Sequence, residues 1–536
     1  MDKYIKFFES LVEYKMINPI YGYVLELIEE EINQKQEKDD FLVVFAVYFS
    51  LLSDGNVCMS LQRDILMSKW QTKIDSTKVL LEENNDFDKT AFNEMSTIAT
   101  TSILNAIEKI NEVNLPEIIG KNRIFIIDDK WLYLMKYETS RLSIIESVTS
   151  LFSYKENNNV EFDYKKCVKD GFVLSNGQEK AIIEGINRNL IITGGPGTGK
   201  TTSILFLLLN LLLKKNDYNI FLVAPSGKAS SRMKESIING LDNLSEDFKT
   251  KNSEVISIIN NLQESTIHRL LSFDSETKGF LYNKGHKFPE NSLFVIDEAS
   301  MIDICLFDSL LAAIPKNARV FMMGDKNQLP SVECGAVFSD LLKSKKLNEC
   351  IIELDESIRF GKETKIFELA SAINNCTKLP IESNSWKDPE EFEIQPDSKD
   401  KPIFYYLNND EKNEKKNIFS VLKKWGDYFL KNLQKDATDL DENDDEKLNR
   451  VFDYTEISKI LCAENEGNRG IKNINTFIVR NYIDRTQFTS VDNYYAGELI
   501  IIKKNNKMLD LYNGDCGVLV TFKNDKTLYL MVKKAS

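Results

Sequence analysis

Residues 190–213 read LIITGGPGTGKTTSILFLLLNLLL, an apolar, β-rich run joined to an apolar helical run by a glycine-rich turn. The turn matches the pattern G-x-x-x-x-G-K-S/T at Gly194, Gly199, Lys200 and Thr201. Glycines allow consecutive backbone N–H groups to face one concavity, and the helix that follows adds its positive N-terminal end. The stretch therefore predicts an anion cradle after a buried strand. The alternative is a plain glycine turn without a ligand.

We expect this cradle to hold the phosphates of a nucleoside triphosphate. Lys200 would reach the β and γ phosphates, and the Thr201 hydroxyl would bind Mg²⁺. The turn supplies nine predicted nucleotide-binding residues: Gly194, Gly195, Pro196, Gly197, Thr198, Gly199, Lys200, Thr201 and Thr202.

Four apolar runs, LIIT, NIFLVA, SLFVID and RVFMMG, alternate with helical stretches after residue 172. This alternation is typical of an α/β fold with a parallel sheet and crossover helices. The third run delivers Asp297 and Glu298 at its carboxyl end, where ligands bind in such sheets. Asp297 suits the Mg²⁺ shell, and Glu298 suits orienting or deprotonating the attacking water. The pattern predicts a P-loop NTPase, although an isolated Asp-Glu pair is usually a solvated turn.

Three further positions indicate which nucleotide is used and how its hydrolysis is sensed. Gln178 precedes the cradle, and its side-chain amide can pair with the N6 and N7 edge of adenine, which would select ATP. Gln328 follows the strand RVFMMG together with Asp325, where an uncharged amide could sense the γ phosphate. Arg359 could act as an arginine finger from a second domain. Each position alone is more often a surface residue, but their order and spacing make them a set.

The length of 536 residues exceeds the size at which single cores stop growing, so we expect several domains. The eight cysteines form no C-x-x-C pair and only two histidines are present, which predicts a reduced, cytoplasmic setting without zinc or iron-sulfur clusters. No signal peptide is evident. The apolar run at 41–52 is too short to span a bilayer and is expected to be a buried helix, so no membrane association is predicted.

Charge sets a mild constraint on function. The net charge of -14 argues against a protein that coats DNA through bulk electrostatics, but not against a motor with a local polar groove. Two polar segments, 398–417 and 435–449, interrupt the last third of the chain. The second contains six carboxylates within residues 439–446, and we expect a solvated loop there.

The motifs LSNGQ, GGPGTGKTT, APSGKASSRM, STIHRLL, VIDEASMID, GDKNQLPSVECGAVF and ELDESIRF resemble the RecD family, the alpha subunit of bacterial exodeoxyribonuclease V among the superfamily 1 DNA helicases. The resemblance is specific over about 172–360, and residues 460–478 and 494–518 are similar to the family's second motor domain. It implies an ATP-dependent motor that moves 5′ to 3′ on single-stranded DNA and unwinds duplex ends in double-strand break repair and recombination. It also implies a heterotrimer with the beta and gamma subunits.

The implied organisation has three parts: a mainly helical partner-docking domain at 1–150, a first RecA-like ATPase domain at 151–348, and a second RecA-like domain at 349–536. The resemblance also gives four residues roles against the DNA strand. Small hydroxyl and basic groups at strand ends suit phosphate oxygens better than base edges. These residues are Ser226, which stands where the family usually has threonine, Lys228, Thr266 and His268, for which a buried core histidine is the alternative.

Two later motifs of superfamily 1 motors, T-x-H-K-S/A-Q-G and T-R-A, are not found before the chain stops at TLYLMVKKAS. We therefore expect an incomplete second domain and weak hydrolysis by the chain alone. The alternative is a truncated ATP-binding scaffold without motor activity. A metabolic kinase is disfavoured, because such an enzyme has no need of GDKNQLPSV. No nuclease motif is evident.

Overall fold

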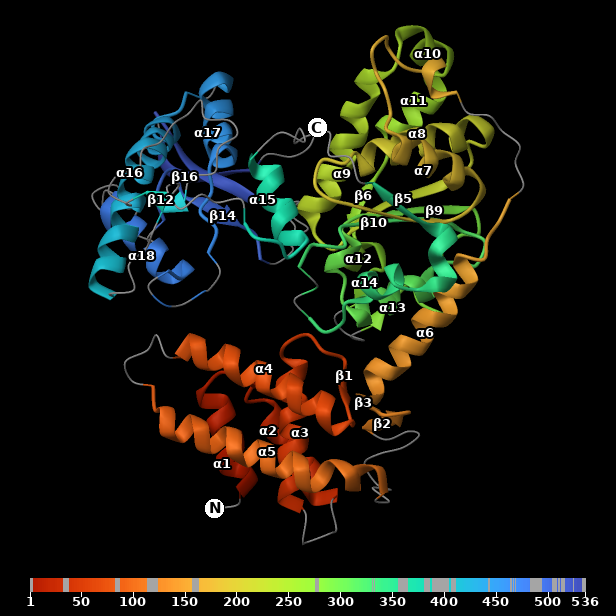
Figure 1. Cartoon of the computed structure of the whole chain (residues 1–536). Coiled ribbons are helices and arrows are strands. Elements are labelled where there is room, and N and C mark those ends of the chain that lie inside the picture. Colours follow the sequence, from red (N-terminus) through yellow and green to blue (C-terminus); the bar gives the residue numbers. More distant parts are fainter. Residues whose placement is uncertain are drawn as a thin grey trace. The chain divides into compact units, whose positions relative to one another are not determined.

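The structure is a computed structural model of the whole chain (Figure 1). It describes residues 3–31, 38–81, 87–112, 124–156, 163–274, 279–329, 331, 333–354, 365–379, 386–387, 404–405, 411–441, 444–462, 465, 467, 469–482, 494–503, 509, 511, 516–523 and 525–532. The chain divides into two compact units. The first comprises residues 1–195, 200–225 and 236–355, and the second comprises residues 196–199, 226–235 and 356–536.

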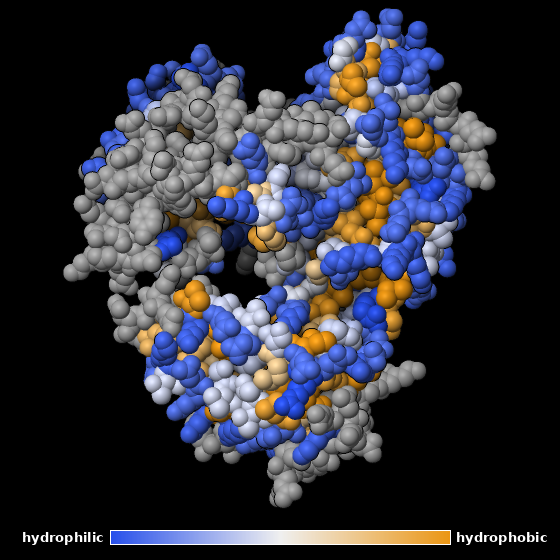
Figure 2. Space-filling model, viewed as in Figure 1, coloured by the Kyte–Doolittle hydropathy of each residue, from blue (hydrophilic) through white to orange (hydrophobic). Residues whose placement is uncertain are grey.

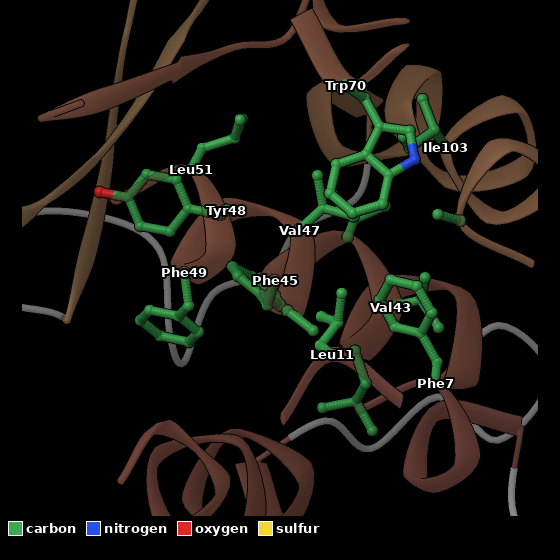
Figure 3. Packing of buried hydrophobic residues seen from close by; sticks show 14 of the residues in the cluster. Phe7, Leu11, Val43, Phe45, Val47, Tyr48, Phe49, Leu51, Trp70 and Ile103 are labelled. Atoms are coloured by element: carbon green, nitrogen blue, oxygen red, sulfur yellow. The ribbon is translucent and has the colours of Figure 1, made fainter. Parts of the chain in front are cut away.

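The first unit begins with five helices around a single apolar core. They are α1 (Lys3–Glu13), α2 (Tyr21–Glu31), α3 (Lys38–Leu52), α4 (Arg63–Leu81) and α5 (Lys89–Glu112). Every residue of α3 from Phe41 to Leu52 is buried, which confirms the helix predicted at 41–52. Figure 3 shows why: side chains of α1, α4 and α5, such as Phe7, Trp70 and Ile103, pack around those of α3.

A small antiparallel sheet and a long helix follow these helices. The sheet has the order β1 (Cys58–Ser60), β3 (Trp131–Leu134), β2 (Phe125–Asp128), and α6 (Met135–Leu151) starts directly after β3. Leu134 donates its backbone N–H to the hydroxyl of Tyr48 on α3 at 2.8 Å. This bond ties the start of α6 to the helical core.

The centre of the first unit is a six-stranded parallel sheet of the predicted α/β type. Its order is β11 (Ile351–Leu354), β4 (Leu190–Gly194), β10 (Arg319–Gly324), β9 (Ser292–Ile296), β5 (Asn219–Ala224), β6 (Glu264–Thr266). All four runs read as strands from the sequence are therefore strands here. They are apolar on both faces because helices cover both faces.

Side-chain alternation along the strands decides which helices cover each face. Ile191 lies in one cluster with α6 and α13 (Ile304–Ala313). Its neighbour Leu190 faces the other way, where Gly185 of α7 (Asn176–Asn187) and Leu207 of α8 (Lys200–Lys214) lie. The remaining helices of this α/β part are α10 (Glu246–Lys251), α11 (Ser253–Asn260), α12 (Ile267–Leu270) and α14 (Val337–Leu342), with a hairpin of β7 (Phe273–Asp274) and β8 (Gly279–Phe280). Helix α9 (Gly227–Gly240) follows β5, and its residues up to 235 belong to the second unit.

The sheet includes the four residues of β11, which the sequence analysis assigned to the second RecA-like domain. Strand β11 pairs in parallel with β4, with Leu354 opposite Gly194. The first sheet thus continues past the predicted boundary at 348. A short strand's sequence does not show which sheet it joins, since that depends on the strand beside it.

The described part of the second unit contains mostly helices and short strands. The helices are α15 (Lys365–Asn374), α16 (Glu411–Ala437), α17 (Asp445–Ile457) and α18 (Ile471–Tyr482). Strands β12 (Trp386–Lys387) and β13 (Phe404–Tyr405) pair in parallel, while β14 (Leu499–Ile501), β15 (Cys516–Phe522) and β16 (Asp525–Val532) form an antiparallel sheet. The predicted α/β P-loop fold behind a helical N-terminal region is confirmed, and the second RecA-like domain stays a proposal.

The acidic run at 439–446 does not lie wholly in a loop. Asp444 accepts the backbone N–H of Lys447 at 2.9 Å and caps α17, whose first turn contains Asp445 and Glu446. Carboxylates favour helix N-termini because the unpaired N–H groups there carry partial positive charge. All eight cysteines are free. No described helix is both long and apolar enough to cross a membrane.

Candidate active site

The predicted anion cradle lies between the end of β4 and the start of α8. Gly197 and Gly199 have φ values of 76° and 81°, a left-handed conformation that glycine adopts without a steric penalty. The next residue, Lys200, starts α8. Its ammonium nitrogen Nζ donates to the carbonyl oxygens of Gly194, at 2.6 Å, and Gly195, at 3.1 Å. The backbone has the turn that the sequence pattern requires.

Three carboxylates at the same edge of the sheet act on Lys200. Burial lowers the pKa of the Lys200 ammonium, and the charges of Asp297, Asp325 and Glu298 oppose that shift. These residues follow β9 and β10, and β10 is paired with both β9 and β4. The sheet order thus brings together side chains that lie about 100 to 125 positions apart in the chain.

Asp297 is the most perturbed of these carboxylates. Burial, reinforced by the neighbouring charge of Glu298, raises its pKa to about 6, although the N–H of Glu298 and the charge of Lys200 act in the other direction. That N–H donates to Asp297 Oδ1 at 2.8 Å. The half-buried carboxylate of Asp297 and the hydroxyl of Thr201, in the first turn of α8, are oxygen donors of the kind Mg²⁺ prefers. The donor set therefore fits a magnesium ion held together with phosphate oxygens.

Glu298 has an uncommon backbone conformation, with φ 51° and ψ 39°. A non-glycine residue in the left-handed region is strained, and such residues concentrate at functional sites. Glu298 precedes the 3-10 turn Ala299–Met301, and within that turn Ser300 Oγ donates to Gln328 Oε1 at 2.7 Å. This hydrogen bond links the loops that carry the predicted water-orienting glutamate and the predicted γ-phosphate sensor.

Gln178 has a structural role that the sequence reading missed. It is fully buried, and it forms a reciprocal capping box with Ser175 at the N-terminus of α7. Gln178 Oε1 accepts the Ser175 N–H at 2.8 Å, and Ser175 Oγ accepts the Gln178 N–H at 3.3 Å. The signal was in the sequence, because SNGQ fits the S-x-x-Q pattern of such a box. The adenine-reading role stays a prediction.

The predicted DNA-contacting residues follow neighbouring strands β5 and β6, which pair at Ala224 and Thr266. Ser226 Oγ accepts the N–H of Ala229 at 3.3 Å, and Thr266 Oγ1 accepts that of Arg269 at 3.2 Å. Both hydroxyls therefore cap helix N-termini. Lys228 is exposed on the first turn of α9.

His268 is exposed, with its ring centroid 5.9 Å from that of Phe280. The buried-histidine alternative is therefore wrong. Its position on α12, one residue after the start of that helix, leaves the imidazole accessible. Arg359, the predicted arginine finger, lies outside the described residues.

Two residues that support the site were not expected from the sequence. Thr193 is buried on β4, and its Oγ1 accepts the N–H of Lys326 at 3.3 Å, which fixes the start of the sensor loop. Arg319 is also buried and donates to three carbonyl groups at the C-terminal end of α7: those of Gly185, Ile186 and Arg188. An arginine at the start of an apolar strand gives no sequence signal for this role.

Comparisons with known proteins agree with this geometry. Residues 178–334 match the family described as AAA domain. The RecBCD enzyme subunit RecD of Buchnera aphidicola subsp. Acyrthosiphon pisum is 27% identical over 76% of this chain and 69% of its own length. RecD of Haemophilus influenzae is 29% identical over 61% of this chain and 55% of its own length. The chain thus spans between about half and just over two thirds of these relatives.

Two more distant likenesses were found. The ATP-dependent RecD2 DNA helicase of Deinococcus radiodurans is 26% identical over 52% of this chain and 33% of its own length. The crystal structure of Bacteroides Pif1 bound to ssDNA covers 67% of this chain and 72% of its own at 14% identity, with a TM-score of 0.33, too low to carry an argument. The chain is thus similar to RecD proteins, and the motifs that carry the similarity are ordered along one parallel sheet.

Proposed function

We propose that this chain is an ATP-hydrolysing DNA helicase subunit of a RecBCD-type complex. The observation that carries the proposal is the convergence of Lys200 with three carboxylates at the carboxyl edge of the parallel sheet. That arrangement suits phosphoryl transfer, in which catalysis consists of positioning and charge stabilisation. The RecD and RecD2 relatives supply the DNA helicase part of the proposal. They do not favour the scaffold alternative.

The hydrolytic roles follow from the positions of the side chains. Lys200 would exchange its two carbonyl partners for phosphate oxygens, because an ammonium group binds an anion more strongly than neutral carbonyls. Asp297 and Thr201 would hold Mg²⁺, which when bound neutralises charge on the phosphates. Glu298 would orient the attacking water and take its proton. Gln328, whose side chain is hydrogen-bonded to Ser300, would sense the γ phosphate.

The proposed DNA path uses the ends of β5 and β6. The segments after these strands carry the exposed side chains of Lys228 and His268. They also contain the N-termini of α9 and α12, which offer backbone N–H groups. Such groups suit a sugar-phosphate backbone and carry no base specificity. We propose single-stranded DNA as the track, with 5′ to 3′ movement and duplex ends as the substrate in break repair and recombination, in the cytoplasm of a bacterium.

We further propose that the helical region, residues 1–150, docks onto the beta and gamma subunits, while 151–348 and 349–536 supply two motor domains. A line of exposed apolar side chains on and beside α2 supports this docking. Ile20, Tyr23 and Leu27 expose 61%, 70% and 57% of their surface and are spaced at helical intervals. Figure 2 shows that hydrophobic residues interrupt the hydrophilic surface on the face in view.

The deciding experiment compares single-strand-stimulated ATPase in the assembled complex with that of a Lys200→Gln variant. Loss of the lysine should lower kcat by roughly 10²- to 10³-fold, as for other groups aimed at developing charge. Lys214→Gln is the matched control, since Lys214 is an exposed lysine at the far end of the same helix. Turnover that is unchanged in Lys200→Gln would contradict the assignment of this site.

A further inference from the structure

The loop that carries the sensor glutamine is fixed at its start by the sheet. We call the described residues 325–329, 331 and 333–335 the sensor segment. The N–H of Lys326 donates to Thr193 Oγ1 on β4, and Gln328 Oε1 accepts from Ser300 Oγ. The N–H of Asn327 donates to Asp325 Oδ1 at 2.9 Å. The beginning of the segment therefore takes its position from the strands that form the nucleotide site.

The end of the sensor segment is fixed by a different part of the first unit. The N–H of Gly335 donates to the carbonyl oxygen of Gly55 at 3.0 Å. Cys334 Sγ lies 3.2 Å from the carbonyl oxygen of Leu52, and the Cys334 side chain packs against the N-terminal helical core. Leu52 is the last residue of α3, and Gly55 lies three residues beyond it. The rigid central helix of the N-terminal region thus ends on the sensor segment.

Further hydrogen bonds hold the described residues next to the second attachment. Ser331 Oγ donates to the carbonyl oxygens of Glu333 and Gly335 at 2.7 and 2.9 Å. The N–H of Ile304 donates to the carbonyl oxygen of Cys334 at 3.2 Å. Ile304 starts α13, directly after the stretch that contains Asp297 and Glu298. Cys334 and Gly335 therefore connect the end of α3 to the loop that carries Asp297 and Glu298 and to the loop that carries Asp325.

Gly335 cannot be replaced without moving this junction. Its φ is +109°, and a Cβ at this position would lie 2.8 Å from Cβ of Ile304. By contrast, Gly55 has φ +84° and nothing within 4 Å of an added Cβ. The backbone at Gly335 is thus constrained both by conformation and by space, as expected where two chain segments must approach closely.

We propose that the end of α3, at residues 52–55, positions the sensor segment, so that the N-terminal helices set the rate of ATP hydrolysis through the contact between Gly55 and Gly335. This inference rests on the proposed ATPase function and adds a regulator to the same site. Gly55, Cys334 and Gly335 act as positioning residues, because the hydrogen bonds described for them are with one another, Leu52 and Ile304. A force or a partner that shifts α3 would act on Gln328 through the hydrogen bonds of Cys334 with Leu52 and Ile304 and the hydrogen bond between Ser300 and Gln328.

The kinetic test replaces three glycines that all have a left-handed backbone conformation but lie at different places in the structure. Gly335→Ala and Gly55→Ala both disturb the junction, whereas Gly171→Ala is the matched control, with φ +88° and nothing within 4 Å of its Cβ. Displacing a catalytic loop by about 1 Å can cost up to about 10²-fold in rate. We expect kcat to fall about tenfold or more in the two junction variants and less than roughly twofold in the control, with KM for ATP changed less than roughly twofold in all three.

Each outcome separates positioning from simple destabilisation. A fall in kcat at constant KM that is limited to the junction variants supports the proposal, with folding checked by circular dichroism. Equal losses in Gly171→Ala, or an undiminished kcat in both junction variants, would overturn it. If Gly335→Ala does not fold, Gly55→Ala decides, since its added methyl group meets open space.

A second measurement does not depend on turnover. If the sensor segment shifts when the γ phosphate is lost, its attachment to residues 52–55 is expected to shift with it, because hydrogen bonds join the two. Hydrogen exchange of the full chain is compared with ADP and with a non-hydrolysable ATP analogue bound. We expect the protection against hydrogen exchange at the amide of Gly335 and in the peptide 51–57 to differ several-fold between the two nucleotide states. The peptide 96–106 of α5 should exchange equally in both. Identical exchange at 51–57 in both nucleotide states would overturn the proposal. Absence of ATPase activity in the wild-type complex would contradict only the proposed function.

Discussion

The ammonium nitrogen of Lys200 lies 2.6 Å from the carbonyl oxygen of Gly194, in the turn that its own helix follows. The lysine is thus already folded back over the cradle and faces the carboxylates of Asp297, Asp325 and Glu298. A buried ammonium group requires such partners, because an unpaired charge away from water is costly. Four predictions test how this site and its surroundings are built.

Replacing Asp297 by asparagine should stabilise the metal-free and nucleotide-free protein at neutral pH. Burial raises the pKa of Asp297 from 3.8 in the unfolded chain to about 6 in the fold. Between these values the folded state binds the extra proton, so the free energy of unfolding falls as pH rises from about 4 to about 6. Removing the carboxylate removes that penalty, which amounts to at most about 3 kcal/mol.

Urea unfolding of wild type and Asp297→Asn at pH 4.5, 6 and 7.5 measures this difference. The advantage of the variant should grow with pH and level off above 6. Asp340→Asn is the control, since Asp340 is exposed on α14 and forms an ion pair with Lys343. A difference that stays constant with pH would show that Asp297 is an ordinary carboxylate.

The capping role of Gln178 and its predicted adenine-binding role can be separated by a substitution that replaces only the side-chain amide nitrogen with oxygen. Gln178→Glu keeps an oxygen that can accept the Ser175 N–H, so the capping box and the stability of α7 should survive within about 0.5 kcal/mol. It removes the amide N–H donor that adenine N7 would require. We therefore expect the affinity for ATP to fall by about tenfold or more, the change that 1.4 kcal/mol of lost pairing represents.

Ser175→Ala is the reciprocal variant for this prediction. It should lower stability by about 1 kcal/mol, because the Gln178 N–H loses its partner, while the affinity for ATP is kept. Calorimetric unfolding and titration of ATP binding report the two effects. An unchanged affinity for ATP in Gln178→Glu would leave Gln178 a capping residue alone.

Arg319 should contribute strongly to the stability of the first unit. Its buried guanidinium group donates to carbonyl groups at the C-terminal end of α7 and lies 5.0 Å from the centroid of the Tyr154 ring. Arg319→Met leaves those carbonyl groups without their donor, and we expect a loss of about 2–4 kcal/mol. Arg319→Lys should recover little of this stability, because lysine lacks the planar guanidinium group with its several N–H donors.

Denaturant unfolding of Arg319→Met, Arg319→Lys and the control Lys343→Met checks this expectation. Lys343 is three quarters exposed, and its pair with Asp340 should contribute less than about 1 kcal/mol. Equal stability of Arg319→Met and Lys343→Met would mean that water replaces the guanidinium group at the end of α7.

The exposed side chains of α2 should be needed for assembly and not for nucleotide binding. Tyr23→Glu combined with Leu27→Glu introduces two charges where apolar contact is proposed, and we expect co-purification with the beta and gamma subunits to fall about tenfold or more. ATP affinity should be unchanged. Val173→Glu with Leu281→Glu is the control, since these residues expose 73% and 54% of their surface, close to the values of Tyr23 and Leu27, but lie in the α/β part of the unit. Normal assembly of the α2 variant would exclude this face as the docking surface.

Local sequence alone determined much of this protein. The glycines of the cradle, the strands around it and the buried helix at 41–52 follow from backbone sterics and from runs of apolar residues, which act over a few neighbouring positions. The acidic pair Asp297–Glu298 was also evident, because a motif at the end of a strand is a local feature. The resemblance to the RecD family was identified from the order of such motifs.

Tertiary structure decided what depends on neighbours that are distant in sequence. The pairing of β11 with β4, the burial of Arg319 against the end of α7, and the contact between Gly55 and Gly335 each join segments more than 130 residues apart. The raised pKa of Asp297 has the same origin, since burial is a property of the packed sheet. Gln178 shows the intermediate case: its capping box was readable locally, but only the fold shows that its side chain is buried. Sequence fixes local conformation through short-range sterics, whereas the environment of a side chain is set by packing between elements that the chain brings together only on folding.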